Sequence, residues 1–237
     1  MIEILQNNWL LLLVGSYPHG PVGGLVATLG MAVLSILLAL PLSIALALGR
    51  LSSNPLFNRP ATFLVYFVRS VPLLMFVFWA YFLVPLLTGA PVPGFVIMVI
   101  TLAFYESGYL AEIVRAGIQA LPAGQYEAGR TLGLSHLRVM RKIILPQALF
   151  NMLPSILGQL VSTVKETSLA YVISTQELTF AADQINHSLL TKPFQVFGLL
   201  AVTYFILNFT LTGIAKLVEV KITKRRTAAD LARSVPA

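Results

Sequence analysis

One stretch of the sequence, residues 25–48, contains no charged side chain and is long enough to cross the hydrocarbon core of a lipid bilayer. A membrane-spanning helix needs about 20 predominantly apolar residues. Four further stretches reach this length with few interruptions, at residues 63–87, 95–116, 149–173 and 194–217. The sequence therefore predicts an all-α membrane protein with five transmembrane helices.

The composition agrees with this prediction. Charged residues make up only 11% of the chain, whereas a typical soluble domain carries about 25%. So few charges cannot coat a water-soluble globule of this size. The hydrophobic fraction of 57% excludes intrinsic disorder. The absence of cysteine excludes a disulfide scaffold and a thiolate metal site.

The basic residues are distributed unevenly over the predicted connections. They gather at residues 50–59, 115–142 and 221–233, whereas the other connections contain only Lys192. Cytoplasmic loops of membrane proteins carry the excess of Lys and Arg. We therefore expect the N-terminus outside and the C-terminus inside. The net charge of +7 then reflects membrane topology, and a nucleic-acid partner is not expected.

The predicted topology divides the chain into three regions. Residues 1–22 form an external segment, and residues 23–220 form one membrane domain whose second helix bends at Pro72. Residues 221–237 form a basic cytoplasmic tail that contacts anionic headgroups. Four apolar residues of the first region share one helical face: Ile2, Leu5, Trp9 and Leu12. They predict an interfacial helix on the outer surface, with a frayed apolar leader as the alternative.

The cytoplasmic segment at residues 121–146 predicts two short helices. Pro122 fits the start of the first helix, and Gly133 suits the left-handed residue that ends it. Ser135 can cap the second helix, and Pro146 is expected to stop it. A loop of this length with its own structure is uncommon in a compact bundle and tends to be functional. This favours a docking element over an ordinary connection.

The same segment resembles the EAA loop of ABC importer permeases. The residues that carry the resemblance are Glu127, Ala128, Gly129, Gly133 and the run Ile143-Ile144-Leu145-Pro146. Gly129 stands where the motif has alanine. Residues 69–74, 107–118 and 165–169 are similar to the polar amino acid subgroup of that family. The resemblance covers residues 22–220.

This resemblance implies a type I ABC importer fold and a division of labour. Such permeases lie in the bacterial inner membrane, pair with a second permease and receive an amino acid from an external solute-binding protein. A cytoplasmic ATPase dimer, which binds ATP and Mg²⁺, docks on the EAA helix, here Glu127, Ala128, Gly129 and Gly133. The small side chains of that helix would let the partner's backbone come close. The chain has no G-x-x-x-x-G-K-[ST] phosphate loop, so it is not expected to be an enzyme or to bind a cofactor or metal itself.

Besides Glu112, Arg115 and Lys216 near the ends of the predicted spans, four ionisable residues lie deeper within them: Arg69, Glu106, Lys165 and Glu166. An ionisable residue at membrane depth is a functional hypothesis by default. Lys165 and Glu166 are adjacent, so their side chains diverge by about 100° on a helix and cannot pair ideally. With the hydroxyl groups of Thr167 and Ser168, they make the most polar patch within any predicted span.

Two roles stay open for this patch, a translocation pathway that binds substrate and a lock between helices. The resemblance favours the pathway, to which we also assign Arg69 and Glu106. For Arg69 alone, snorkelling to the cytoplasmic interface is the simpler role. Glu106 is expected to pair with Lys165 or with the partner permease, and Glu112 with Arg115.

The leading hypothesis is therefore the permease subunit of an ATP-driven importer for polar L-amino acids. The subgroup resemblance leans towards glutamate and aspartate, for which Lys165 and Arg69 are suitable cations. A different permease is expected as the partner, because Lys165 and Glu166 need complementary charges. The alternative is a secondary carrier or channel that works without an ATPase, although the sequence lacks the internal repeats that carriers often show. An intramembrane enzyme is disfavoured, since the spans contain no nucleophile–base or metal-binding pattern.

Overall fold

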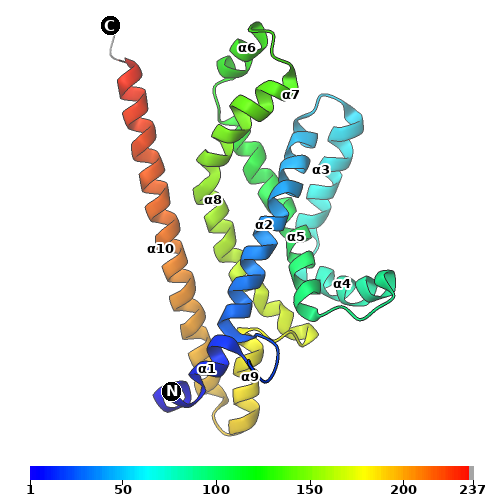
Figure 1. The fold of residues 1–237 in the computed structure, drawn as a ribbon, viewed down its shortest axis with the longest axis vertical. Helices are drawn as coiled ribbons and strands as arrows, with labels where there is room; N and C mark the ends of the chain where they lie inside the picture. The colour runs from blue at the N-terminus through cyan, green and yellow to red at the C-terminus, as the bar shows by residue number, and fades with distance from the viewer. Residues whose placement is uncertain (235–237) are drawn as a thin grey trace.

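The computed structural model describes the backbone of residues 1–234 and the side chains of residues 1–224. Over that part of the chain the regular elements are helices and no β-strand forms, which confirms the predicted all-α fold (Figure 1). In chain order they are α1 (Ile2–Val14), α2 (Gly24–Leu51), α3 (Pro55–Ser70), α4 (Leu73–Thr88), α5 (Gly94–Gln119), α6 (Ala123–Thr131), α7 (His136–Val139), the π-helical turn η1 (Met140–Ile144), α8 (Leu145–Glu166), the 3₁₀-helix η2 (Thr167–Ile173), α9 (Leu178–Leu189) and α10 (Pro193–Ser234).

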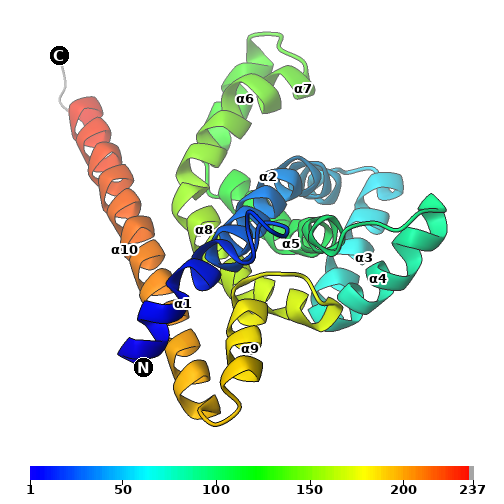
Figure 2. The same ribbon diagram turned by 60° about the horizontal axis from the view of Figure 1, so that its bottom comes forward.

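Helices α2 and α5 lie side by side along the middle of the molecule and make its most extensive helix–helix contact (Figures 1 and 2). Ala39 of α2 is fully buried in one cluster with Leu110 and Val114 of α5. The hydroxyl group of Ser35 donates across the contact to the carbonyl oxygen of Val99 at 3.2 Å. Small residues let membrane helices approach closely, and hydroxyl groups bond between them. Helices α3, α8 and the 3₁₀-helix η2 also pack against both members of this pair.

Four helical segments are long and apolar enough to cross a membrane: Gly24–Leu51, Gly94–Gln119, His136–Ile173 and Pro193–Lys224. Helices α3 and α4 qualify only as a pair, because they are bent by 104° at the break between them. The structure thus has four spans, or the predicted five if the bent pair counts as one. The bend at Pro72 is confirmed, and residues 63–87 do not form one continuous helix.

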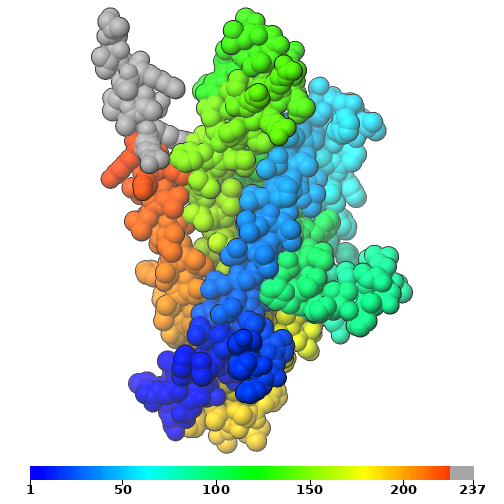
Figure 3. Space-filling model, in the orientation of Figure 1, coloured from blue at the N-terminus to red at the C-terminus, as the bar shows by residue number. Residues whose placement is uncertain are grey.

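The break between α3 and α4 has a local cause. Proline disfavours the α-helical conformation for the residue before it, and Val71 is extended, with φ −95° and ψ 133°. Helix α4 therefore leaves the bundle sideways, and Figures 1 and 3 show it standing apart from the column of long helices. Its exposed apolar side chains include Trp79, Phe82 and Leu86.

The two short helices predicted for the 121–146 segment are present as α6 and α7. Gly133 has a φ of 77°, as a left-handed helix end requires, and the hydroxyl group of Ser135 accepts from the backbone N–H of Arg138 at 3.4 Å. The expectation that Pro146 stops the second helix is wrong, because α7, η1 and α8 run on as one rod. Proline is tolerated in the first turn of a helix, so Pro146 starts α8 instead.

Helix α1 packs against α2 and α9 at the end of the molecule opposite to α6 (Figures 1 and 3). Its residues Ile4 and Leu12 are buried, whereas Ile2 and Trp9 of the predicted apolar face remain exposed. These exposed side chains agree with an interfacial helix, which stays a prediction, as does the division into three regions. The basic tail from residue 225 onward lies outside the residues with described side chains.

Candidate functional site

A polar cluster lies where α5 meets α8. Glu106 is fully buried and accepts hydrogen bonds from the Nε2 atom of Gln159 at 2.8 Å and the hydroxyl group of Thr163 at 2.6 Å. The carboxyl group of Glu166 interacts electrostatically with that of Glu106. The expected pairing of Glu106 with Lys165 is not found, because the Lys165 side chain is exposed on the other side of the helix. Two acidic groups from different helices therefore meet at this point.

The hydroxyl groups beside this cluster bond to their own helix. Thr167 donates to the carbonyl oxygen of Val164 at 2.8 Å, and Ser168 donates to that of Lys165 at 2.7 Å. These bonds reach back three residues, where α8 tightens into the 3₁₀-helix η2. The Oε2 atom of Glu166 is buried without a hydrogen-bond partner. The adjacent positions 165 to 168 thus differ in exposure, and only part of the predicted patch faces Glu106.

A second charged cluster is centred on Glu112 of α5. Its Oε1 atom lies 2.6 Å from Nη1 of Arg50 and 3.3 Å from Nη1 of Arg69, and its Oε2 atom lies 2.8 Å from Nε of Arg115. The pairing of Glu112 with Arg115 is confirmed. The sequence could not indicate the other two contacts, because Arg50 and Arg69 lie 62 and 43 residues away in the chain.

Two aromatic rings accompany these arginines. The guanidinium carbon of Arg50 lies 5.4 Å from the ring centroid of Tyr66, and that of Arg69 lies 5.5 Å from the ring centroid of Tyr109. Such cation–π contacts hold a guanidinium group over a ring face. Glu112 and Tyr109 therefore set the direction of the Arg69 side chain. Its snorkelling to the cytoplasmic interface stays a prediction.

The helix α6 that carries the EAA-like residues is packed on the rod formed by α7, η1 and α8. Gly129 is buried there, and a Cβ atom at this position would lie 2.9 Å from Cγ2 of Val139. The small size of Gly129 thus serves packing within the chain, contrary to the expectation that it admits a partner's backbone. Glu127, Ala128 and Gly133 are exposed.

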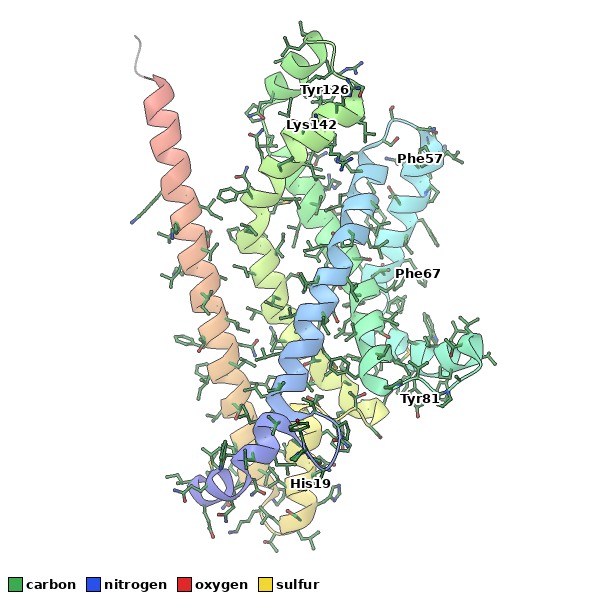
Figure 4. All side chains as sticks on the ribbon, in the orientation of Figure 1. His19, Phe57, Phe67, Tyr81, Tyr126 and Lys142 are labelled. Atoms are coloured by element: carbon green, nitrogen blue, oxygen red, sulfur yellow. The ribbon has the colours of Figure 1, made fainter. Side chains whose placement is uncertain are left out.

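Two polar contacts fasten α6 in place. The Tyr126 hydroxyl group lies 2.9 Å from Nδ1 of His136, and the Nε2 atom of Gln147 donates to Gln125 at 2.9 Å. Figure 4 shows Tyr126 close to the tip of the molecule, with Lys142 below it on the rod. The α6 surface is therefore presented at the end of a long helical element.

Glu177 is a buried acidic residue that the sequence did not single out. It caps α9 by accepting from the backbone N–H groups of Thr179 and Phe180, each at 2.8 Å, and from the hydroxyl group of Tyr204 at 3.2 Å. Burial raises the pKa of Glu177 to about 7, although the hydrogen bonds that its carboxylate accepts act in the opposite direction. It joins α9 to α10 at the α1 end of the molecule.

Comparison with known proteins identifies the family to which the chain is similar. Residues 39–224 match the family described as "Binding-protein-dependent transport system inner membrane component". The chain is 34% identical over 202 residues to the probable glutamine ABC transporter permease protein GlnP of Bacillus subtilis, with 84% of this chain and 92% of that protein covered. It is 33% identical over 218 residues to the glutamate transport system permease protein GluD of Corynebacterium glutamicum, with 90% and 78% covered.

Among solved structures, an amino acid ABC transporter determined with histidines is similar in fold and sequence. The TM-score is 0.73 and the sequence identity is 33%, over 84% of this chain and 92% of that chain. The similarity therefore extends over nearly the whole of the solved chain.

Proposed function

Because the chain belongs to the family of binding-protein-dependent transport system inner membrane components and is an amino-acid ABC importer permease, we propose that it imports polar L-amino acids with energy from a partner ATPase. Glutamate and aspartate are the substrates that we favour. The relatives named above carry the names of glutamine and glutamate, and another relative, from Bacillus subtilis, is named for arginine. The exposed cationic groups of Lys165 and Arg69 support an acidic substrate.

The observation that carries this proposal is the continuous rod His136–Ile173. Near one end, α6 is packed on the rod through Gly129. Near the other end, Glu166 lies beside the buried Glu106. Rigid helices can carry a displacement between distant sites. A movement that a partner imposes on α6 would thus reach the polar cluster.

We assign the coupling role to Glu127, Ala128, Gly129 and Gly133. Glu127 and Ala128 are exposed and would contact the ATPase. Gly129 lets α6 pack closely against Val139 of α7. Gly133 adopts the positive φ of the turn that follows α6. Leu132 at the same tip is 80% exposed. A large exposed apolar side chain beside an accessible helix supports a protein contact at this place.

We assign the pathway role to Glu106, Lys165, Glu166, Thr167, Ser168 and Arg69. Charged groups at membrane depth face a bundle interior or an aqueous path rather than lipid. Lys165, whose side chain is exposed, would meet the substrate or a group of the second permease. Glu106 is covered by Gln159 and Thr163, so it would act mainly through Glu166.

The assembly that we propose contains three further components. A cytoplasmic ATPase dimer binds ATP and Mg²⁺, an external solute-binding protein delivers the amino acid, and a second, different permease completes the pathway. The complex lies in a bacterial inner membrane, with the α1 end outside and the α6 end in the cytoplasm. The described ends of α1 and α10 lie at opposite ends of the molecule (Figure 1), which supports opposite sides for the termini.

The proposal is tested by reconstituting the chain with its partner permease, ATPase and binding protein in liposomes. We expect ATP-dependent uptake of L-glutamate or L-aspartate that stops when the ATPase is omitted. Uptake that continues without the ATPase would favour the alternative of a secondary carrier or channel. Uptake of L-glutamine or L-arginine alone would keep the importer and correct the substrate.

A further inference from the structure

One face of α8 carries hydrogen-bonding side chains along nearly the whole helix. The residues of this polar face, which include one glycine, are Gln147, Asn151, Ser155, Gly158, Ser162 and Lys165. They follow one another at spacings of four, four, three, four and three residues, which places them on one side of an α-helix. At 1.5 Å per residue the series is about 27 Å long. It therefore extends over most of the hydrocarbon core of a bilayer, which is about 30 Å thick.

The described part of the chain leaves this polar face uncovered. Gln147, Ser155, Gly158 and Lys165 are exposed, and a Cβ atom added at Gly158 would have no atom within 4 Å. The side of α8 that packs against the rest of the chain carries other residues, and its buried members are Ala148, Met152, Ile156, Thr163 and Val164. The polar face of α8 thus points away from the fold of its own chain.

Helix α2 shows the opposite arrangement, which is the one expected next to lipid. Its hydroxyl-bearing residues Thr28, Ser35 and Ser43 are fully buried, whereas Val33 and Leu37 are among its exposed residues. Polar side chains of membrane helices face a bundle interior or an aqueous path rather than lipid. The exposed polar face of α8 therefore requires a cover that is not lipid.

Water suits this face better than a tightly packed helix of the second permease does. Van der Waals packing drives the association of membrane helices, and the polar face has no large apolar side chain for such packing. An ammonium group, amides and hydroxyl groups are costly to bury unless each of them finds a partner. Water supplies such partners along the whole face.

The two ends of the polar face also lie at functional positions. At one end, Lys165 is adjacent to Glu166, which interacts with the buried Glu106. At the other end, the Nε2 atom of Gln147 donates to Gln125 of α6 at 2.9 Å. The face therefore runs from the polar cluster to the helix on which the ATPase is proposed to dock (Figure 1).

We propose that the polar face of α8 is a wall of the water-filled path along which the amino acid leaves the polar cluster for the cytoplasm. Residues 147–164 contain no charged side chain, so amide and hydroxyl groups contact the charged ends of the amino acid without forming ion pairs. Passage requires binding that is weak enough for release. The second permease lies across this path and does not pack against the polar face. The inference rests on the proposed function and deepens it.

The test uses thiol labelling, because the chain contains no cysteine of its own. Ser155→Cys and Ser162→Cys place a thiol on the polar face. Leu153→Cys, at an exposed apolar position of the same helix, is the matched control. The complete transporter in liposomes is treated on both sides with a charged, water-soluble methanethiosulfonate reagent. The two polar-face thiols should react at least about tenfold faster than the control thiol, because the reactive thiolate forms in water and not in apolar surroundings.

Transport provides the second measurement. ATP-dependent uptake is followed on the same preparations before and after labelling. The bulky adducts at positions 155 and 162 should obstruct the path and lower uptake. Leu153→Cys that has been labelled with a lipid-soluble maleimide should retain its uptake. Fast labelling of the polar face that leaves uptake unchanged would place this face outside the path and overturn the inference.

Slow methanethiosulfonate labelling at all three positions would also overturn it. The lipid-soluble maleimide then identifies the cover, since reaction with it would indicate lipid and protection from it would indicate a packed helix of the second permease. Ser162→Cys keeps the test decisive if Ser155→Cys does not assemble. If the complete transporter takes up no amino acid before labelling, the proposed function fails, whereas the labelling rates still decide whether water covers the polar face.

Discussion

The guanidinium group of Arg50 lies 2.6 Å from the carboxylate of Glu112, although the residues are 62 positions apart in the chain. This contact joins the end of α2 to α5 at the point where Arg69 of α3 also arrives. Three helices thus share one carboxylate. Both the packing of the bundle and the direction of Arg69 depend on it.

Replacing Arg50 should therefore weaken the fold. In Arg50→Gln the buried side of Glu112 loses its shortest charge-assisted contact, and we expect the free energy of unfolding to fall by about 2 kcal/mol. Denaturation in detergent micelles, followed by circular dichroism, measures this change. Arg59→Gln, at an exposed position of α3, is the control and should change stability little. Equal stabilities for the two variants would contradict the role of Glu112 as a shared anchor.

The close packing of Gly129 of α6 against Val139 of α7 gives a second prediction. In Gly129→Ala the new Cβ atom would lie 2.9 Å from Val139, so α6 should shift or detach and ATP-dependent uptake should fall. Gly124→Ala, where no atom lies within 4 Å of the added methyl group, should have little effect. Adding Val139→Ala to Gly129→Ala removes the clash and should restore uptake. A double variant as impaired as Gly129→Ala alone would mean that the clash is not the cause.

The turn after α6 is tested separately. Gly133 has a φ of 77° and open space around it, so Gly133→Phe combines backbone strain with an obstacle at the proposed docking surface. We expect uptake to fall to background while the chain remains folded in the membrane. Gly89 has a similar φ of 68° and open space at the end of α4. Gly89→Phe should therefore retain uptake, and a comparable loss there would remove the evidence for docking at α6.

Glu177 should make stability depend on pH. Its pKa is raised from 4.5 to about 7 in the folded protein, so between these values the folded state keeps a proton that the unfolded chain releases. The contribution of Glu177 to stability should therefore fall as the pH rises from 4.5 to about 7, by about 3 kcal/mol. Unfolding measured across this range should depend less steeply on pH in Glu177→Gln than in the native protein.

A control variant separates this effect from the other acidic groups. Glu127 is exposed on α6, so Glu127→Gln should leave the pH dependence as it is in the native protein. A slope in Glu177→Gln as steep as that of the native protein would show that Glu177 does not contribute to the pH dependence.

Sequence patterns correctly predicted two helix ends in the 121–146 segment. Gly133 ends α6 in the left-handed conformation and Ser135 caps α7, because both depend on residues within one turn of the chain. Pro72 was correctly expected to bend the second span, but its position alone could not give a bend of 104°. The path of α4 after that bend depends on packing against η2 and α5, which are distant in sequence.

The sequence by itself determined the helical class, the membrane location of the apolar segments and the EAA-like helix, since these follow from length, hydropathy and short-range spacing. The tertiary structure alone decided the partners of the intramembrane charges. Glu106 lies with Gln159 and Thr163, and Glu112 with Arg50 and Arg69. Each of these contacts joins different helices across 43 to 62 residues. Such pairs form only when the helices pack together, because a charged side chain within a membrane is stabilised by a partner on a neighbouring helix.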